Sequence, residues 1–475
     1  MGRRLTRPKI NLLFGAKAPK GASSTYDLSG VRVRIAVGDD RSNAEFIFKN
    51  LKQIVGRELS PLVIDLLEIA SIIFVADQYF PGNRNQFREI EALIPVRQPK
   101  IWKKAAWKLQ ETIAFLTQDS YEFHFVKRKT ESMTNKISGK PSEPISGSCI
   151  ALLSGGLDSF SGAKELLKKG ETPIFVSHYA RGGSHAAQKK VVQCLQSKFK
   201  QQISYCRVLV GKRNTEKSVM RLKSSSGRLA VQFSRSFLFL SLATALAIEL
   251  GVKRVFMFEN GSIAVNVAIS ESRINTKTAH PRFLQLYGDL IRLLFGVDLD
   301  IQNPYLYKTK SEVVENLLSD DFRSSIKIAT SCWQTARVQQ RAVEKGLPKG
   351  VFKGHHCGVC YPCILRRVSL ASLHLQPKYD DDYLTDIFKE YPAFPRGSLE
   401  ETITTIGDLL RFSHDMKTLS DNQLFARYPD LSIDAYGVDL EKVVNTYRRH
   451  ADQIIECFNT LSNARIRQKF SSLLV

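Results

Sequence analysis

The spacing of apolar and polar residues changes several times along the chain, and each change marks an expected element. Residues 31–37 alternate between apolar and polar side chains, which is typical of a β-strand with one exposed face. Residues 61–70 carry apolar side chains at helical spacing behind Ser60, and a proline stands first in the run, as at many helix starts. Residues 102–116 predict an amphipathic helix, and residues 121–126 alternate again. This part of the chain therefore predicts a mixture of helices and strands.

Short apolar runs then alternate with longer helical patterns. The runs have the length of buried strands and lie at 150–153, 173–178, 203–210 and 252–258. The helical patterns between them lie at 160–169, 185–199 and 231–250. Strands that alternate with helices predict a doubly wound parallel α/β sheet with right-handed crossovers. Residues 237–250 form the most apolar segment, which is too short to span a bilayer and predicts a buried helix.

These patterns divide the 475 residues into five parts. We expect a basic tail (1–25), an N-terminal α+β domain (26–130), a linker rich in Ser, Thr, Gly and Pro (131–147), the parallel α/β domain (148–375) and a helical C-terminal extension (376–475). A chain of this length usually folds around more than one core.

A glycine turn joins the first strand of the α/β domain to the helix that follows. It reads Ser154-Gly155-Gly156-Leu157-Asp158-Ser159. The glycines let the backbone approach a ligand closely, and the helix start presents free N–H groups and a positive dipole end, which is a geometry that binds phosphate. No Gly-Lys-Ser/Thr follows, so the turn is not a Walker A loop. It resembles the loop of the PP-loop ATP pyrophosphatases, which cleave ATP between the α and β phosphates and adenylate an oxygen of the substrate.

The formal net charge of +23 suits an anionic partner such as a nucleotide, a nucleic acid or an acidic protein. The basic residues are spread along the chain without a long run, so charge alone does not establish nucleic-acid binding. No secretory signal is visible at the N-terminus. Eight cysteines, four of them in one region, indicate a reducing compartment and a metal site rather than disulfides. We therefore expect a cytoplasmic protein with no membrane segment.

The clustered cysteines have the spacing of metal ligands: Cys332, Cys357, Cys360 and Cys363. Four thiolates satisfy tetrahedral Zn²⁺, and a Cys-x-x-Cys knuckle lets two of them reach one ion. An iron–sulfur cluster is the alternative, because Cys-x-x-Cys-x-x-Cys also occurs in ferredoxin-type sites. His355 or His356 could replace Cys332 as a ligand. We expect a structural zinc that holds the segment carrying Arg366 near the mouth of the site.

The phosphate loop and the cysteine group together resemble the QueC family of 7-cyano-7-deazaguanine synthases. The resemblance covers about residues 148–375. It includes Arg235 before an apolar helix, Asn303-Pro304-Tyr305-Leu306, Lys310-Ser311-Glu312-Val313, Cys357-Gly358 and Cys363-Ile364-Leu365-Arg366. It implies an ATP-dependent carbon–nitrogen ligase that adenylates the carboxylate of a 7-deazapurine and releases pyrophosphate. An amine then attacks the mixed anhydride to give an amide, and the family repeats the activation to make a nitrile.

The resemblance also implies roles for individual residues. The phosphate loop holds the β and γ phosphates of ATP through Ser154, Gly155, Gly156, Leu157, Asp158 and Ser159. Asp158 orders the loop or a Mg²⁺ ion, and a plain helix cap is the alternative. Lys310 and Arg235 neutralise charge at the α phosphate during transfer. For Lys310, the alternative is a solvated lysine at a helix start.

The substrate is expected to contact residues that follow the fourth strand of the α/β domain. Glu259, Asn260 and Gly261 close that strand, and Asn266 and His280 lie in the long segment after it. We expect these residues to contact the purine. A lone histidine is more often structural, which is the alternative for His280.

Three features depart from the family. Cys332 lies 25 positions before Cys357, and residues 179–185 differ from the family's Tyr-Gly-Gln-Arg-His segment. The family also lacks the large N-terminal domain and the C-terminal extension. The enlarged form looks like the QueC-like proteins of antiphage defence operons, of the Qat type or from CBASS operons. There the resemblance suggests conjugation to a macromolecule, conceivably a partner protein from the same operon. A tRNA-modifying PP-loop enzyme and an ATP-binding scaffold subunit are the alternative functions.

Overall fold

The computed structural model describes most of the chain. The described residues are 9–14, 31–35, 37, 42–80, 87–128, 143–179, 185–213, 232–269, 276–319, 321–390, 399–432 and 437–474. Most of the predicted linker (131–147) lies outside them.

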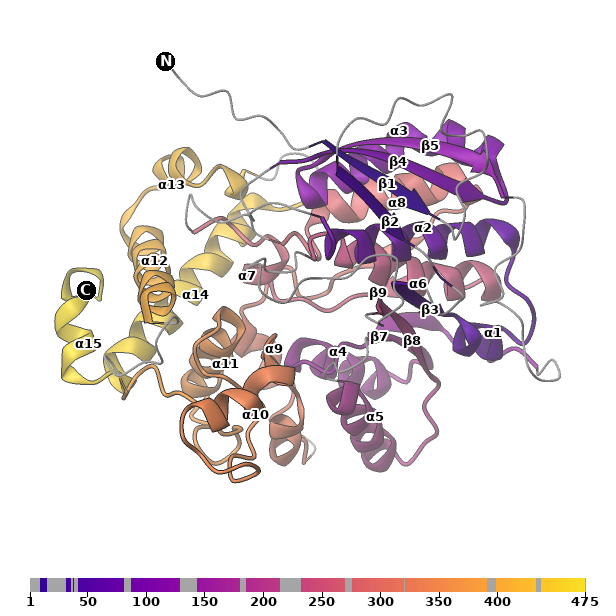
Figure 1. Cartoon of the computed structure of the whole chain (residues 1–475). Coiled ribbons are helices and arrows are strands. Elements are labelled where there is room, and N and C mark those ends of the chain that lie inside the picture. The colour runs from indigo at the N-terminus through magenta and orange to yellow at the C-terminus, as the bar shows by residue number, and fades with distance from the viewer. Residues whose placement is uncertain are drawn as a thin grey trace, which may run out of the picture.

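The sheet of the α/β domain has six strands among the described residues, and five of them run parallel (Figure 1). In spatial order the strands are β10 (Asp300–Gln302), β9 (Arg254–Phe256), β6 (Cys149–Leu152), β7 (Pro173–Tyr179), β8 (Tyr205–Lys212) and β3 (Ala44–Ile47). Strand β3 comes from the N-terminal part and pairs with β8 in the antiparallel direction. The parallel α/β fold predicted from the alternating patterns is confirmed.

Helices cover both faces of this sheet. On one face lie α4 (Leu157–Lys168) and α5 (His185–Phe199), and on the other lies α6 (Arg235–Leu250). Successive side chains of β6 point to opposite faces, so Ile150 shares a cluster with Phe237 of α6, and Ala151 shares one with Phe160 of α4. Because both faces are covered, the strand is apolar along its length.

A second, four-stranded parallel sheet lies in the N-terminal part. Its strands follow the order β2 (Val31–Ile35), β1 (Lys9–Phe14), β4 (Glu89–Val96) and β5 (Ser120–Lys127). Strand β1 lies between β2 and β4, so the expectation of a basic tail over residues 1–25 is wrong for residues 9–14. The rest of that tail lies outside the described residues. Because the strands are parallel, this part is of α/β type rather than α+β.

The two sheets share one hydrophobic core. Helix α2 (Pro61–Asp77) packs against α6, and α3 (Pro99–Thr117) packs against α8 (Pro281–Phe295). Every residue of α2 from Val63 to Asp77 is buried, which is why this helix is apolar on nearly all sides. The short helix α1 (Lys49–Val55) contacts β8 and α6. The N-terminal part is therefore packed onto the α/β domain rather than tethered to it.

The remaining described elements are helical. They are α7 (Gly261–Ala264), α9 (Lys310–Glu315), η3 (Arg323–Ile328), α10 (Thr335–Glu344), α11 (Tyr361–Ser372), α12 (Leu399–Thr418), α13 (Asp421–Arg427), η4 (Pro429–Leu431), α14 (Leu440–Leu461), α15 (Ala464–Lys469) and η5 (Ser471–Leu473). The C-terminal extension is thus helical as expected, and α14 packs on α11 and α12. None of the helices in the described ranges has the length and apolarity needed to cross a bilayer.

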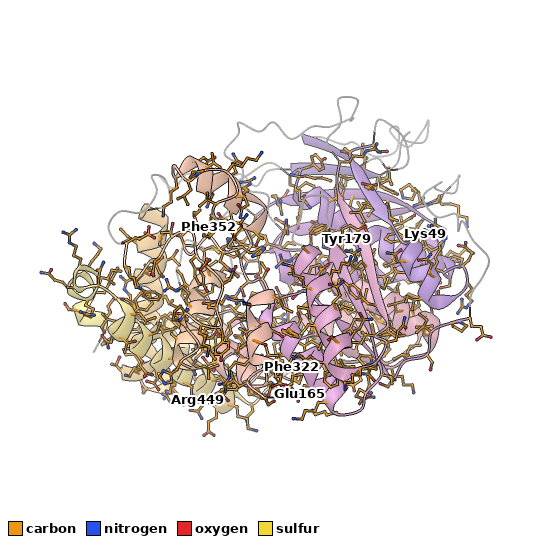
Figure 2. All side chains as sticks on the ribbon, turned by 90° about the horizontal axis from the view of Figure 1, so that it is seen from below. Lys49, Glu165, Tyr179, Phe322, Phe352 and Arg449 are labelled. Atoms are coloured by element: carbon orange, nitrogen blue, oxygen red, sulfur yellow. The ribbon has the colours of Figure 1, made fainter. Side chains whose placement is uncertain are left out.

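Side chains fill the space between these elements (Figure 2). Phe322, labelled in that view, follows α9 in the chain and packs its ring against Phe160 of α4, with ring centroids 5.8 Å apart. This contact joins the segment before the cysteine group to the helix that carries the phosphate loop.

Candidate active site

The phosphate loop occupies the turn between β6 and α4, at the C-terminal edge of the main sheet. Gly155 has a φ of 83°, in the left-handed region that favours glycine. A Cβ at this position would lie 2.8 Å from the backbone N of Gln188, closer than real Cβ contacts. The carbonyl of Gly155 accepts a hydrogen bond of 3.0 Å from the backbone N–H of Thr330. The loop is therefore held between α5 and the segment before α10.

Two serine hydroxyls lie inside the loop. Ser154 Oγ and Ser159 Oγ are 2.9 Å apart, and the backbone N–H of Gly156 donates to Ser154 Oγ at 3.2 Å. Gly156 is the N-cap of α4 and has no side chain to accept from the first turn. The first N–H groups of a helix have no partner within it, so those of Leu157, Asp158 and Ser159 point outward. These groups, the hydroxyls and the positive helix end can bind phosphate oxygens.

Asp158 links the phosphate loop to two other segments. Its Oδ1 lies 2.7 Å from Lys310 Nζ, and its Oδ2 accepts a hydrogen bond of 2.7 Å from Asn260 Nδ2. Both charged side chains are largely buried, with 8% of Asp158 and 11% of Lys310 exposed. Asp158 is therefore neither a plain helix cap nor solvated, and Lys310 is not a surface lysine. Oδ2 also accepts from the backbone N–H of Asn260 at 3.3 Å, whereas Oδ1 has Lys310 as its one partner among the described residues, so Oδ1 is the oxygen that fits a Mg²⁺ ligand.

A second carboxylate stands beside this pair. Glu259 follows β9, and burial and the charge of Asp158 raise its pKa from 4.5 to about 8, although Lys310 and Arg235 act in the opposite direction. Asn303, which follows β10, holds the backbone of Glu259: its Oδ1 accepts from the Glu259 N–H at 3.1 Å, and its Nδ2 donates to the Glu259 carbonyl at 2.9 Å. The ends of β9 and β10 are therefore joined at the site.

Arg235 is the second cation near Glu259. It begins α6 after Ser234, whose Oγ donates to buried Asp77 at 2.5 Å and fixes the start of that helix. Burial lowers the pKa of Arg235, and the charge of Glu259 raises it. The Nε of Arg235 has no acceptor among the described residues, and its guanidinium lies 5.7 Å from the ring centroid of Phe239. A half-buried cation with a donor to spare suits an anionic ligand.

Three of the residues predicted to contact the substrate have clear structural contacts. A Cβ on Gly261 would lie 2.1 Å from the carbonyl oxygen of Leu306, so glycine is required there by packing. Asn266 has a φ of 49° and donates from Nδ2 to the carbonyl of Thr276 at 2.6 Å.

His280 caps α8 through Nδ1, which accepts from the backbone N–H of Arg282 at 3.2 Å. Its ring packs edge-on against Phe115 of α3, with ring centroids 5.0 Å apart. Burial, with the charges of Lys277 and Arg282, lowers the pKa of His280 to about 3. These contacts fit the structural alternative for His280, and they lie with the N-terminal part rather than with the phosphate loop.

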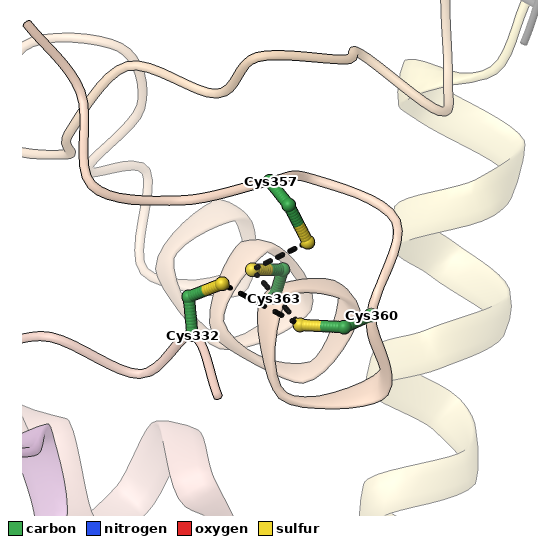
Figure 3. A group of neighbouring side chains, drawn as sticks. All are labelled: Cys332, Cys357, Cys360 and Cys363. Atoms are coloured by element: carbon green, nitrogen blue, oxygen red, sulfur yellow. Dashed lines mark hydrogen bonds between the residues drawn. The ribbon is translucent and has the colours of Figure 1, made fainter. Parts of the chain in front are cut away.

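The four predicted metal ligands lie together (Figure 3). The Sγ atoms of Cys332, Cys357, Cys360 and Cys363 are all within 4.8 Å of one another, and all four side chains are buried. Zn–S bonds of about 2.3 Å in a tetrahedron require sulfur atoms about 3.8 Å apart. The Sγ–Sγ distances are 3.9 Å between Cys357 and Cys363, 3.9 Å between Cys360 and Cys332, and 3.3 Å between Cys360 and Cys363. Four buried thiolates this close together form a donor set that fits a Zn²⁺ ion.

The histidines do not replace Cys332. His356 is fully buried, its Nε2 accepts from the backbone N–H of Ser331 at 3.1 Å, and its Nδ1 bonds Asp381 at 2.8 Å. His355 is exposed and pairs with Asp381 as well. Both rings are thus committed to protein partners.

The cysteine group is tied to the phosphate loop through the segment that carries Cys332. Arg366 of α11 is fully buried and donates to the carbonyls of Ala329 at 2.8 Å and Ile326 at 3.3 Å. Thr330, which follows Ala329 in the chain, donates its backbone N–H to the Gly155 carbonyl. These contacts connect the helix that carries Cys363 to the phosphate loop, and Arg366 is a buried structural residue in this connection.

Sequence reasoning assigned no role to several residues that support the site, although Asn303 belongs to a segment of the family resemblance. Thr330 bonds the phosphate loop at Gly155, and Asn303 bonds the backbone of Glu259. Arg449 and Gln453 of α14 contact the start of α9. One signal was available: Thr309 and Glu312 have the spacing of a capping box, which predicts the start of α9 and so places Lys310. The contacts from α14 leave no local pattern in the sequence.

A parallel α/β sheet with this glycine turn at its C-terminal edge, beside buried Asp158 and Lys310, defines a nucleotide-binding domain of the PP-loop class. Residues 148–374 match the family model described as Queuosine biosynthesis protein QueC. These residues form a QueC-like PP-loop domain, and the match covers just under half of the chain. No curated protein matches the chain.

Proposed function

We propose that this chain is an ATP-dependent carbon–nitrogen ligase that adenylates the carboxylate of a 7-deazapurine. The observation that carries the proposal is the Asp158–Lys310 pair at the phosphate loop, inside a region that matches the QueC family model. A buried lysine directly beside a phosphate-binding turn suits charge that develops on a phosphoryl group.

The phosphate loop would hold the β and γ phosphates through its first-turn N–H groups and the hydroxyls of Ser154 and Ser159. This leaves the α phosphorus near Lys310, whose ammonium Asp158 orients. The substrate carboxylate attacks the α phosphorus, the bond to the β-phosphate oxygen breaks, and pyrophosphate leaves. An amine then attacks the acyl carbon, loses a proton and expels AMP, which yields an amide. A bound Mg²⁺ ion, for which Asp158 is a fitting ligand, would supply charge neutralisation at the phosphates.

Glu259 and Asn260 would recognise the base, because both follow β9 at the edge of the sheet where ligands bind in such folds. A carboxyl group accepts through its carbonyl oxygen even when it is protonated, and a deazaguanine offers ring N–H and amino groups as donors. The four cysteines would hold a structural Zn²⁺ that supports the segment behind the loop. The four cysteines would fill all four coordination positions of the ion, as in other structural zinc sites.

We further propose that the end product is a conjugate with a macromolecule, as in the antiphage-defence type of QueC-like protein. The support is the size of the N-terminal and C-terminal parts that flank the matched region. The acceptor that we favour is a protein encoded in the same operon. We also propose that the chain acts in the cytoplasm.

The direct test is incubation with Mg²⁺-ATP and 7-carboxy-7-deazaguanine, followed by measurement of pyrophosphate. The expected result is release that requires both compounds, with AMP formed in equal amount when ammonium is added. Asp158→Ala should abolish release. Failure of the wild-type protein to release pyrophosphate, with and without proteins of the same operon, would overturn the proposal.

A further inference from the structure

The start of α9, which carries Lys310, is held by a helix from the C-terminal extension. Arg449 of α14 donates from Nε to Glu312 Oε1 at 2.7 Å and from Nη2 to the Tyr307 carbonyl at 2.9 Å. Figure 2 labels Arg449, which lies in the C-terminal helical part. Gln453, one turn further along α14, donates to Thr309 Oγ1 at 3.2 Å. Residues beyond the QueC-like region thus contact both sides of Lys310.

These contacts meet the capping box of α9. Thr309 Oγ1 accepts from the backbone N–H of Glu312 at 3.3 Å, and Glu312 Oε2 accepts from the N–H of Thr309 at 2.9 Å. Gln453 Oε1 also accepts from the Ser311 hydroxyl at 3.0 Å. Helix α9 has six residues, and a helix that short is not stable alone. Its position therefore depends on its neighbours, and α14 is one of them.

Helix α14 also holds the segment that follows Glu259. The hydroxyl of Tyr447 donates to the Ser262 carbonyl at 3.0 Å and accepts from the Val267 N–H at 3.2 Å. Tyr447 is buried and packs edge-on against Phe412 of α12. One helix of the extension thus contacts both segments that leave the sheet at the site, after β9 and after β10.

We infer that α14 is a positioning element of the ligase site, in which Arg449 and Gln453 set the place of Lys310 by clamping the capping box of α9. The inference rests on the proposed function for the chemistry that Lys310 performs. Neither residue touches the substrate in this assignment, so both act through Lys310. A ligase built this way requires its C-terminal extension for adenylation itself and not only for contact with an acceptor.

The chain offers a matched control on the same helix. Arg448 is next to Arg449 and similarly exposed, but it pairs with Asp421 at 2.6 Å and donates to the Met416 carbonyl at 3.3 Å, both within the extension. Arg448→Ala removes the same charge from the same helix without touching α9.

The test compares Arg449→Ala and Gln453→Ala, singly and combined, with Arg448→Ala in the full chain. Displacement of a reacting group costs roughly 10- to 100-fold in rate. We expect the combined variant to lose kcat for pyrophosphate release in this range, with the Kd for ATP within about twofold of wild type because the phosphate loop is intact. Arg449→Lys should recover part of the rate. Arg448→Ala should keep the wild-type kcat.

Hydrogen exchange gives a readout independent of activity. The backbone N–H groups of residues 309–314 should exchange faster in the combined variant and not in Arg448→Ala. A combined variant with wild-type kcat and wild-type exchange at 309–314 overturns the inference. A wild-type protein with no pyrophosphate release overturns the proposed function instead, and exchange alone then decides whether α14 positions α9.

Discussion

The Lys310 ammonium lies 2.7 Å from the Asp158 carboxylate, although 152 positions separate the two residues in the chain. Asp158 lies in the part of the phosphate loop that forms the first turn of α4, and Lys310 is the first residue of α9. A buried ion pair gains little net stability, because both charges lose their hydration. The pair is better explained as a means of holding the lysine in one place at the rim of a phosphate site.

Lys310→Met is expected to lower kcat for pyrophosphate release about 100-fold, because loss of one charge-stabilising group in a site costs roughly that much. It should also lower the unfolding temperature, because Asp158 then stays buried without its cation. Steady-state pyrophosphate release and thermal unfolding measure the two effects.

Lys308→Met is the matched control for this prediction. The Lys308 side chain lies over the Tyr305 ring, 5.3 Å from its centroid, and the backbone carbonyl that accepts from Gly261 is unchanged by the substitution. Equal losses of kcat in Lys308→Met and Lys310→Met would show that Lys310 has no specific role.

Gly155→Ala is expected to remove ATP binding. Gly155 and Gly170 have similar left-handed φ values of 83° and 78°, so alanine strains the backbone by about 1 kcal/mol at either position. A Cβ at Gly155 meets the backbone of Gln188, whereas one at Gly170 has nothing within 4 Å. Calorimetry should therefore find ATP binding in Gly170→Ala and not in Gly155→Ala. Retained binding in Gly155→Ala would contradict the placement of the phosphate at this loop.

Local patterns in the sequence predicted the elements that carry the phosphate loop. The apolar run of β6 is such a pattern, and so, in the N-terminal part, is the Ser60-Pro61 start of α2. Both involve only residues that are neighbours in the chain, so the sequence alone predicts them. Strand β1 could not be predicted in this way, because its six residues lie in a basic stretch and become a strand by pairing with β2 and β4. Its formation depends on contacts with residues far along the chain.

The site divides in the same way. The loop and Cys357, Cys360 and Cys363 were predicted because their chemistry depends on short spacings, and Cys332, 25 positions earlier, was added because a tetrahedral zinc takes four ligands. The family resemblance pointed to Lys310. Its ion pair with Asp158 and the hydrogen bonds from α14 to the start of α9 could not be predicted, because they join elements that are far apart in the sequence. His280 was expected to contact substrate, and an apolar contact with Phe115 instead explains its burial.

The cysteine group is expected to bind one zinc ion per chain. Cys363→Ser should lose the zinc and unfold at lower temperature, since a structural zinc site contributes directly to folding. Cys206→Ser is the control, because Cys206 is equally buried, in β8, and not in the group. Mass spectrometry of the metal content should find zinc in wild type and Cys206→Ser only. Iron in place of zinc would favour the iron–sulfur alternative.

Glu259→Gln is expected to stabilise the protein at alkaline pH. Burial raises the pKa of Glu259 from 4.5 to about 8, so the folded protein holds this proton more tightly than the unfolded chain. The stabilising contribution is complete below pH 4.5 and is lost as the pH rises towards 8. Glutamine cannot ionise, so at pH 8 the variant should exceed wild type by about 1 kcal/mol or more in unfolding free energy.

Urea unfolding from pH 5 to 8 measures this difference. Glu171→Gln should show the opposite sign, because hydrogen bonds from Arg254 and Ser148 lower the pKa of Glu171. Should the gap between Glu259→Gln and wild type stay constant over this range, Glu259 would not be held protonated. Loss of pyrophosphate release in the stabilised variant would mark Glu259 as a substrate-binding residue.

His450 of α14 is expected to make the protein less stable in mild acid. Neither ring nitrogen has a partner among the described residues, and burial, with the charge of Lys310, lowers the pKa from 6.5 to about 4. The unfolded chain binds a proton below pH 6.5 and the folded protein does not, so unfolding free energy falls between pH 6.5 and 4 and then levels off. The loss from this group is at most about 3 kcal/mol.

His450→Leu should remove this part of the pH dependence and keep wild-type stability at pH 7, because the ring makes no hydrogen bond that leucine would break. His178 and His280, whose pKa values burial also lowers, to about 4 and about 3, leave a remaining slope of the same sign in both proteins. The decisive quantity is therefore the difference between wild type and variant in urea titrations from pH 7 to 4. His374→Asn, at an exposed position, should follow wild type. Parallel curves for wild type and His450→Leu would show that His450 takes up its proton without cost, and the packing of α14 beside Lys310 would then be looser than its contacts imply.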